Sequence, residues 1–470
     1  MLFSDKNQRR FRRMGKACSH CGNMNKSIRH LAVDILDEVH RSKAFAGLLL
    51  DDCLDANELS STPDGRLLTH LVYGVLRMRD HLDWILAKLS RGNWEKTDVS
   101  IKNILRVGLF QLKFNDRLPA FAVVDEAVKV AKIVDAPKSG LVNALLRNYL
   151  RHGSTIAFPS PEKNPAEFIA AFHSHPLWLV KSWIKIFGIS ETQALCAANN
   201  EMPPLTLRVN MLKTSRDELQ EKLTVAGFNV TATPFSPDGL ILNNPVSPIQ
   251  KTNFFQEGYL RLQDEGSQLV SYLLNPQSSE SILDVCAGTG GKTTHLAAIL
   301  KNNGQILATD YDFKKIEELK KDAVRLGITG IETRQANLTD RLPELFKDKF
   351  DSVLVDAPCS GLGTLRRNPE IKWHTTADNL PSFTQTQNTV LQNASLAVKK
   401  GGHLVYCTCS LLPQENENVI SNFLKLNPHF SACPPPESIP QKLIDSNGYF
   451  RTFPHLHNMD GFFAARFKRK

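Results

Sequence analysis

Two cysteines lie in short motifs that could perform nucleophilic chemistry. Cys359 follows Asp356 in VDAPCSGLGTLRR, and Cys409 lies in YCTCSLLPQENE. Each motif comes directly after an apolar, strand-like run. We therefore expect all three residues at the carboxyl ends of strands, where open α/β sheets bind their ligands. A thiolate beside a carboxylate suits covalent catalysis, because a nucleophile divides one difficult step into two easier ones.

A third motif, LDVCAGTGGKT, contains a glycine-rich turn. The P-loop pattern fails because Cys286 stands where a glycine is required. The dinucleotide fingerprint fails because Thr293 takes the place of its third glycine. Asp284, Gly288 and Gly290 do fit the Asp-x-x-x-Gly-x-Gly turn of S-adenosylmethionine (SAM) methyltransferases. A merely structural turn is the alternative interpretation.

Asp310 favours cofactor binding over a structural turn. It ends the next strand-like run, roughly 20 residues beyond the glycines, where an acidic side chain can bind ribose hydroxyls. The glycines would let the backbone approach the amino-acid part of the cofactor.

A thiolate, a carboxylate and a methyl donor together suit methylation of carbon 5 of cytosine. That carbon is a poor nucleophile until a thiolate adds to carbon 6 and converts the ring into an enamine, which can attack a sulfonium methyl group. Asp356 could hold the N3 or N4 edge of the ring. A base must then remove the proton from carbon 5, and the thiol must leave.

These motifs, with the terminal DGFFAARF, resemble the RNA cytosine-5 methyltransferases, and within them the Sun/Fmu type. LVYGVLRMRDHLDWIL resembles the NusB-like RNA-binding domain of that type, while HPLWLVKSW, LRVNMLKTS and DEGSQ fit its connecting region. The resemblance covers residues 25–470. It implies a cytoplasmic monomer that uses SAM to methylate small-subunit (16S) ribosomal RNA, naked or in an early assembly intermediate, at cytosine 967 in bacterial numbering.

The resemblance also implies roles for individual residues. Cys409 would be the nucleophile, Cys359 would assist release of the adduct, and Asp356 would position the base. The residues implied to bind SAM are Cys286, Ala287, Gly288, Thr289, Gly290, Gly291, Lys292, Asp310, Asn337 and Asp356. No metal is expected.

Five of the candidate positions leave alternatives open. The family usually has proline in place of Thr289 and often aspartate in place of Asn337, although an asparagine oxygen can accept from the adenine amino group. Arg366 and Arg367 could form a solvated loop, but beside the site we expect them to contact RNA phosphates. Cys286 could simply be a packing residue.

The apolar pattern divides the chain into an all-α NusB-like part, a small α/β connecting unit and a Rossmann-like SAM methyltransferase domain. We expect a disordered basic extension over 1–24, the helical RNA-binding domain over 25–152 and a linker over 153–175. The connecting subdomain would span 176–262 and the methyltransferase domain 263–470. Cys18 and Cys21 resemble half of a zinc site whose other half is missing nearby.

Composition is consistent with an RNA partner. The 470 residues carry a formal net charge of +9, which suits a polyanion. Nine cysteines in a chain with no secretory signal indicate reduced thiols. The sequence contains no run of 18 apolar residues, so we expect no membrane-spanning helix. The competing interpretations are a non-catalytic rRNA assembly factor and a cytosine-5 methyltransferase acting on tRNA or DNA. A DNA enzyme would use Cys359 as the nucleophile and leave Cys409 idle.

Overall fold

The computed structural model describes residues 26–115, 117–245, 248–337, 339–340 and 344–470. The chain forms two compact units. The first consists of the described residues up to Glu201 together with the segment Leu365–His374, and the second of Met202–Thr364 and Thr375–Lys470. The expectations for residues 1–24, including Cys18 and Cys21, lie outside the described residues.

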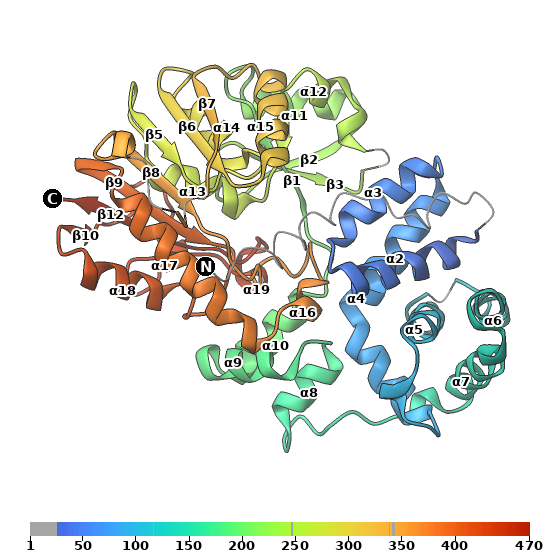
Figure 1. Ribbon diagram of the computed structural model, residues 1–470. Coiled ribbons are helices and arrows are strands. Elements are labelled where there is room, and N and C mark those ends of the chain that lie inside the picture. The colour runs from blue at the N-terminus through green and yellow to red at the C-terminus, as the bar shows by residue number, and fades with distance from the viewer. Residues whose placement is uncertain (1–25, 116, 246–247, 338, 341–343) are drawn as a thin grey trace. The chain divides into compact units, whose positions relative to one another are not determined.

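The first unit is helical (Figure 1), as the apolar spacing predicts. The side chain of Ser27 accepts a hydrogen bond from the backbone N–H of His30 and so caps the first helix, whose Leu31, Ile35 and Val39 are buried. Its longer helices are α2 (Ile28–Ser42), α3 (Ala46–Ala56), α4 (Pro63–Leu89), α5 (Val99–Phe114), α6 (Ala120–Asp135), α7 (Ser139–His152), α8 (Pro165–Phe172), α9 (Leu177–Phe187) and α10 (Ile189–Ala198).

Helix α8 lies inside the stretch 153–175, where we expected a linker. The segment packs on α4, because the Nδ1 atom of His81 lies 2.8 Å from the carbonyl oxygen of Phe172. The ring of His81 also stacks on Phe158 at a centroid distance of 4.8 Å. The proline and serine content suggested a loop, but the phenylalanines supply apolar surface that is buried against the helices.

Backbone carbonyls beside a kink in α4 at Met78 accept hydrogen bonds from a distant part of the chain. Met78 has φ −105° and ψ 15°, so the helical hydrogen bonding is interrupted there. The Leu76 carbonyl accepts from Nε1 of Trp373 at 2.9 Å, and the Arg77 carbonyl accepts from Nζ of Lys372 at 3.2 Å. Both donors lie in α16 (Ile371–His374), within the segment Leu365–His374. The first unit therefore includes a piece of sequence from beyond Cys359.

The second unit begins with a small antiparallel sheet in the order β2-β3-β1-β4. Buried leucines on alternate positions of β1 and β3 pack against Leu219 and Leu223 of a covering helix. The elements are β1 (Leu205–Val209), α11 (Arg216–Val225), β2 (Asn229–Ala232), β3 (Gly239–Asn243), α12 (Asn253–Gln256) and β4 (Leu260–Leu262).

The main sheet has the order β10-β12-β9-β8-β5-β6-β7, with β11 paired to β12. The five strands from β9 to β7 are parallel, as expected, whereas β12 and β10 extend the sheet antiparallel. An antiparallel edge on a parallel sheet is common in α/β folds. The strands are β5 (Ser281–Asp284), β6 (Gln305–Asp310), β7 (Ile331–Gln335), β8 (Phe350–Asp356), β9 (Val398–Thr408), β10 (Phe430–Ala432), β11 (Phe450–Arg451) and β12 (Phe463–Arg469).

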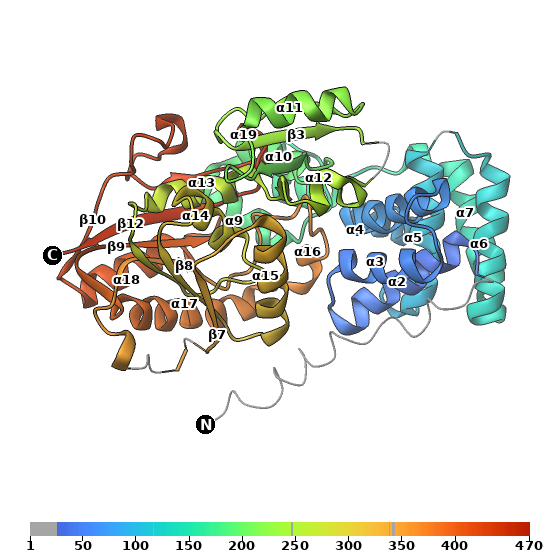
Figure 2. The ribbon, with the colours of Figure 1, turned by 90° about the horizontal axis from the view of Figure 1, so that it is seen from above.

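Helices cover both faces of this sheet. One apolar cluster joins it to α13 (Glu265–Leu274), α14 (Gly291–Ile299) and α15 (Phe313–Leu326). Another joins it to α17 (Leu380–Ser395) and α18 (Glu417–Leu426). Figure 2 shows α13 and α14 on one side of the sheet and α17 and α18 on the other. The short helix α19 (Pro454–His457) lies between β11 and β12 in sequence. This layered arrangement places the carboxyl ends of the parallel strands along one edge.

Candidate active site

The predicted site residues gather where the parallel strands end. Asp284 is the last residue of β5, Asp310 of β6 and Asp356 of β8, while Cys409 follows β9 directly. Strand β8 pairs with both β5 and β9, so these ends are neighbours in the sheet. This is the edge at which open α/β sheets bind ligands.

The glycine turn between β5 and α14 has the conformation that its sequence requires. Gly288 has φ +56° and Gly290 φ +84°, a backbone region that side chains disfavour. The N–H of Gly288 donates to Oδ2 of Asp310 at 2.9 Å, so the carboxylate at the end of β6 holds the turn. A Cβ atom added to Gly288 would meet open space, which leaves the turn accessible to a ligand.

One buried acidic side chain beside the turn, Asp284, fits the cofactor that the sequence predicts. Asp284 is 1% exposed, and burial, partly offset by the hydroxyl of Thr293, raises its pKa to about 7. One oxygen of Asp284 accepts from that hydroxyl at 2.7 Å, while Oδ1 has no partner within the described residues. An unpartnered buried acceptor beside an open glycine turn is suited to the amino-acid part of SAM.

Two further predicted cofactor residues differ in their exposure. Cys286 lies at the start of the turn, and burial, followed by the nearby charge of Asp310, raises its pKa well above the usual range of a thiol. Asn337 follows β7 and is exposed, with Oδ1 accepting from the backbone and hydroxyl of Thr339. Cys286 is thus an inert thiol, and the amide oxygen of Asn337 already has local donors.

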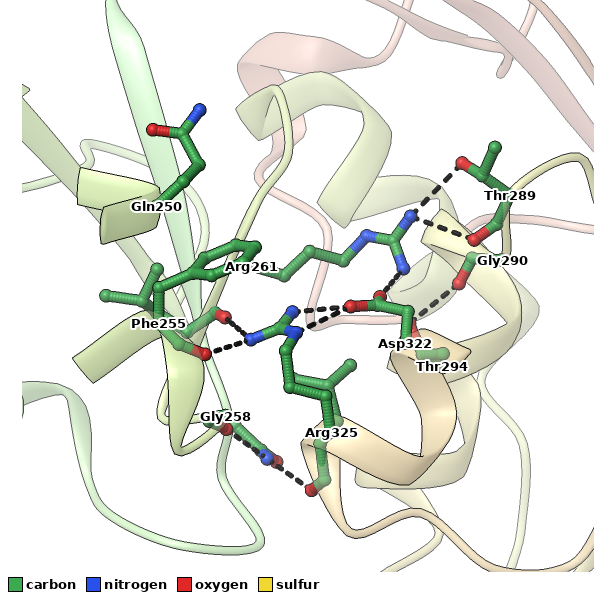
Figure 3. Close-up of polar contacts among 12 residues, drawn as sticks. Gln250, Phe255, Gly258, Arg261, Thr289, Gly290, Thr294, Asp322 and Arg325 are labelled. Atoms are coloured by element: carbon green, nitrogen blue, oxygen red, sulfur yellow. Dashed lines mark hydrogen bonds and ion pairs between the residues drawn. The ribbon is translucent and has the colours of Figure 1, made fainter. Parts of the chain in front are cut away.

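The turn is held from its outer side by the connecting subdomain (Figure 3). Arg261 of β4 donates from Nη2 to the carbonyl of Thr289 at 3.0 Å and to its hydroxyl at 3.2 Å, and it also pairs with Asp322 of α15. Buried Arg208 of β1 donates to the carbonyl of Gly291 at 2.5 Å. Thr289 therefore offers its hydroxyl as well as its carbonyl as an acceptor to a fixed guanidinium.

The two candidate thiols lie side by side. Sγ of Cys359 is 3.3 Å from Sγ of Cys409, and the N–H of Gly363 donates to the carbonyl of Cys409 at 2.8 Å. The hydrogen bond to Cys409, then burial and the charge of Glu415, raise the pKa of Cys359 well above the range of an ordinary thiol. Cys359 therefore retains its proton and can donate it to the sulfur of Cys409.

A buried lysine and a carboxylate complete this end of the site. Nζ of Lys292 donates to Oδ2 of Asp356 at 2.6 Å, and the thiol of Cys407 donates to Oδ1 at 3.3 Å. Burial alone would lower the pKa of Lys292, but the charge of Asp356 overcomes this effect and raises it. Lys292 is consequently a fixed cation beside Asp356.

Arg366 and Arg367 lie in the segment that belongs to the first unit. Arg366 is only 2% exposed, and its Nη2 lies 4.0 Å from a carboxylate oxygen of Glu201. The guanidinium of Arg366 is thus buried in the RNA-free chain, and its contact with an RNA phosphate stays a prediction. Arg367 is half-buried. A wholly solvated loop, the alternative interpretation, does not fit the burial of Arg366.

Sequence reasoning missed Glu415, Gln387 and Arg261. Glu415 is fully buried and accepts hydrogen bonds beside both cysteines, yet its motif PQENE looks like a polar loop. An acidic residue two positions before a helix does not by itself indicate that its side chain is buried.

Within the described residues, no group of three His, Cys, Asp or Glu side chains could hold a metal ion. No helix in that part of the chain is long and apolar enough to cross a membrane.

Comparison with known proteins matches all three parts of the chain. Residues 271–468 match the family described as 16S rRNA methyltransferase RsmB/F. Residues 26–151 match the NusB family, and residues 175–249 match the RsmF/B-like ferredoxin-like domain. These matches agree with the helical, connecting and methyltransferase parts described above.

Individual relatives can be aligned with nearly the whole of this chain. The probable ribosomal RNA small subunit methyltransferase B of Synechocystis is 37% identical over 94% of this chain and 99% of its own length. The corresponding Bacillus subtilis protein is 34% identical, with coverage of 94% and 99%. The crystal structure of PH0851 has a TM-score of 0.78 at 27% identity and covers 96% of this chain and 99% of its own.

Proposed function

Because this chain belongs to the 16S rRNA methyltransferase RsmB/F family, we propose that it methylates carbon 5 of a cytosine in 16S rRNA through a covalent cysteine adduct. The cofactor is SAM, which supplies an electrophilic methyl group on a sulfonium. The proposed target is cytosine 967 in bacterial numbering. We place RNA recognition in residues 25–152 and the chemistry in residues 263–470, with a monomer acting in the cytoplasm on naked rRNA or an early assembly intermediate.

The proposed reaction uses Cys409 as the nucleophile. Its thiolate adds to carbon 6 of the cytosine and forms a C–S bond, which makes carbon 5 an enamine carbon. Carbon 5 then forms a bond to the methyl group, and the methyl–sulfonium bond breaks to leave a neutral thioether. A base takes the proton from carbon 5, the electron pair restores the ring double bond, and the thiolate of Cys409 departs.

The position of Cys359 supports a role after the adduct has formed. In the free protein the hydrogen bond to Cys409 is the largest cause of the raised pKa of Cys359, followed by burial and the charge on Cys409. Once Cys409 is bonded to carbon 6 it carries no negative charge, so two of these causes disappear. The thiol of Cys359 then gives its proton to solvent water more readily, and the resulting thiolate can take the proton from carbon 5 and so assist release.

In the proposed reaction Asp356 and Lys292 orient the cytosine. One oxygen of Asp356 is held by Lys292 at 2.6 Å, and the side chain of Asp356 remains 34% exposed. A carboxylate fixed in this way can accept from the exocyclic N4 amine of cytosine.

The observation that carries the proposal is the pair of thiols 3.3 Å apart beside the glycine turn. A protein that only binds rRNA needs neither thiol, and a DNA-type enzyme needs only Cys359. The test is transfer of labelled methyl from SAM to naked 16S rRNA, with tRNA and DNA as competitors, followed by bisulfite mapping of the product. We expect one resistant cytosine in 16S rRNA. Binding without label would favour an assembly factor, and label at a base other than cytosine would exclude the proposed reaction.

A further inference from the structure

One buried carboxylate contacts the residues that follow both cysteines. Glu415 is 0% exposed, and its Oε1 accepts from the backbone N–H of Ser360 at 2.8 Å. Its Oε2 accepts from the hydroxyl of Ser360 at 2.5 Å and from the hydroxyl of Ser410 at 2.5 Å. Ser360 follows Cys359 and Ser410 follows Cys409 in sequence. A single side chain thus joins the loop after β8 to the loop after β9.

Neighbouring side chains make the same connection from other elements. Gln387 of α17 donates from Nε2 to Glu415 at 3.0 Å and to the carbonyl of Pro358, just before Cys359, also at 3.0 Å. Asn416 accepts from the hydroxyl of Thr408 at 2.6 Å and donates to the carbonyl of Ser410 at 2.8 Å. Hydrogen bonds consequently hold the residues on both sides of each cysteine.

The energetics of this arrangement are unusual for a residue that only fills space. A buried carboxylate loses its hydration, which costs several kcal/mol unless its partners compensate. The partners of Glu415 are all neutral N–H and O–H donors, and no cation of the described chain lies within ion-pair distance of it. An apolar side chain could fill the space without that cost. It could not, however, hold two separate loops at a defined distance.

We propose that Glu415 is a positioning residue that holds Cys359 and Cys409 within proton-transfer distance of each other. The proposal rests on the proposed function only in that it takes these two thiols as the reacting groups. The carboxylate also has an electrostatic effect, because its charge is one of the causes that raise the pKa of Cys359, after the hydrogen bond to Cys409 and burial. It therefore helps to keep a proton on Cys359 before the adduct forms.

The distance between the thiols can be tested without RNA. Dibromobimane becomes fluorescent when it bridges two thiols, and peptide mass spectrometry identifies the bridged pair. We expect rapid bridging of Cys359 to Cys409 in the wild type and bridging at least about tenfold slower in Glu415→Ala, because the effective concentration of one thiol at the other falls. Alkylation of each thiol by iodoacetamide should still occur. Gln414→Ala, an exposed neighbour, is the matched control and should bridge like the wild type.

Glu415→Gln separates geometry from charge. The glutamine can donate to both serine hydroxyls, which are able to accept, so the loops keep their distance. We expect bridging close to the wild-type rate, while alkylation of Cys359 begins at a lower pH because the negative charge is gone. An unchanged pH profile of Cys359 in this variant would overturn the electrostatic part of the proposal.

Wild-type bridging in a folded Glu415→Ala variant would overturn the proposal. If that variant does not fold, the double variant Ser360→Ala/Ser410→Ala removes only the two hydroxyl donors. Bridging at the wild-type rate in the double variant would equally overturn the proposal.

In methyl-transfer kinetics, Glu415→Ala should lower kcat and leave KM for SAM unchanged, because the cofactor turn follows β5. An equal effect on KM would count against a positioning role for Glu415. A wild type that bridges but does not methylate cytosine contradicts the proposed function and leaves this inference standing.

Discussion

Sγ of Cys359 lies 3.3 Å from Sγ of Cys409, although 49 residues separate them in sequence. The register between β8 and β9 places Asp356 opposite Cys407, so the two loops leave the sheet side by side. At this distance a proton can pass directly from one sulfur to the other. The contact gives the two thiols unequal properties before any substrate arrives, and this inequality underlies their proposed roles.

Replacing each thiol should give a different phenotype. In Cys409→Ala the attacking sulfur is lost, so neither a covalent adduct nor a methylated product should form. In Cys359→Ala attack and methyl transfer should remain possible, but release should fail and a protein–RNA complex should survive denaturing electrophoresis when SAM is present. Cys433→Ala, which alters a free cysteine outside the site, is the control. A trapped complex in Cys409→Ala and none in Cys359→Ala would reverse the two roles.

Asp310→Ala should weaken the binding of SAM by roughly 1–3 kcal/mol, the range expected when buried hydrogen bonds to a charged group are lost. The carboxylate holds the glycine turn through the N–H of Gly288 and also accepts from the N–H of Asp312. Titration calorimetry measures the change. Glu317→Ala on the outer face of α15 provides the matched control, with an unchanged dissociation constant. An Asp310→Ala protein that binds SAM as tightly as the wild type would remove this residue from the cofactor site.

The pair formed by Lys292 and Asp356 should couple in a double-mutant cycle. Lys292→Met leaves the carboxylate without its cation and should reduce the free energy of unfolding by about 2 kcal/mol, a moderate value because Asp356 is partly exposed. Adding Asp356→Asn removes the uncompensated charge and should restore part of that loss. Urea unfolding of the four proteins measures the coupling. Strictly additive losses would show that the two groups do not stabilise each other. All three variants should methylate poorly.

His81 should make the helical unit less stable in mild acid. Burial lowers its pKa from 6.5 to about 4, partly offset by the contact with Phe172. Between these values the unfolded chain binds a proton that the folded chain does not, so stability falls as the pH decreases from about 6.5 toward 4. The loss between pH 7 and pH 5 should be about 2 kcal/mol larger in the wild type than in His81→Gln. Glutamine can still donate to Phe172 but does not titrate, so equal losses in urea unfolding would exclude His81 as the source.

Local patterns predicted much of this molecule. The apolar spacing of Leu31 and Ile35 depends only on the helical period, and the turn at Gly288 depends on a backbone conformation that glycine alone adopts readily. The strand ends at Asp356 and Cys409 follow from short apolar runs with polar residues after them. In each case the information lies within a few neighbouring residues.

Features that depend on distant partners were not predicted. The burial of Arg366, which is only 2% exposed, has no signal in the neighbouring residues of its loop. Glu415 gains its importance from Ser360, 55 positions away. The pairing of β12 with β9 depends on how the chain returns to that strand, and no residue within β12 specifies it. Such relationships require the tertiary structure, because neither partner alone carries a signal.

The segment Leu365–His374 has a consequence for the order in which the protein is made. Residues up to Glu201 leave the ribosome first, but the carbonyls of Leu76 and Arg77 receive their donors only after Lys372 and Trp373 have been synthesised. At translation rates of about 5–20 residues per second, the nascent helices wait on the order of ten seconds or more for these contacts. The N-terminal helices are therefore an incomplete folding unit during synthesis. Their packing is completed only after the chain has been extended past Cys359, the first of the two cysteines.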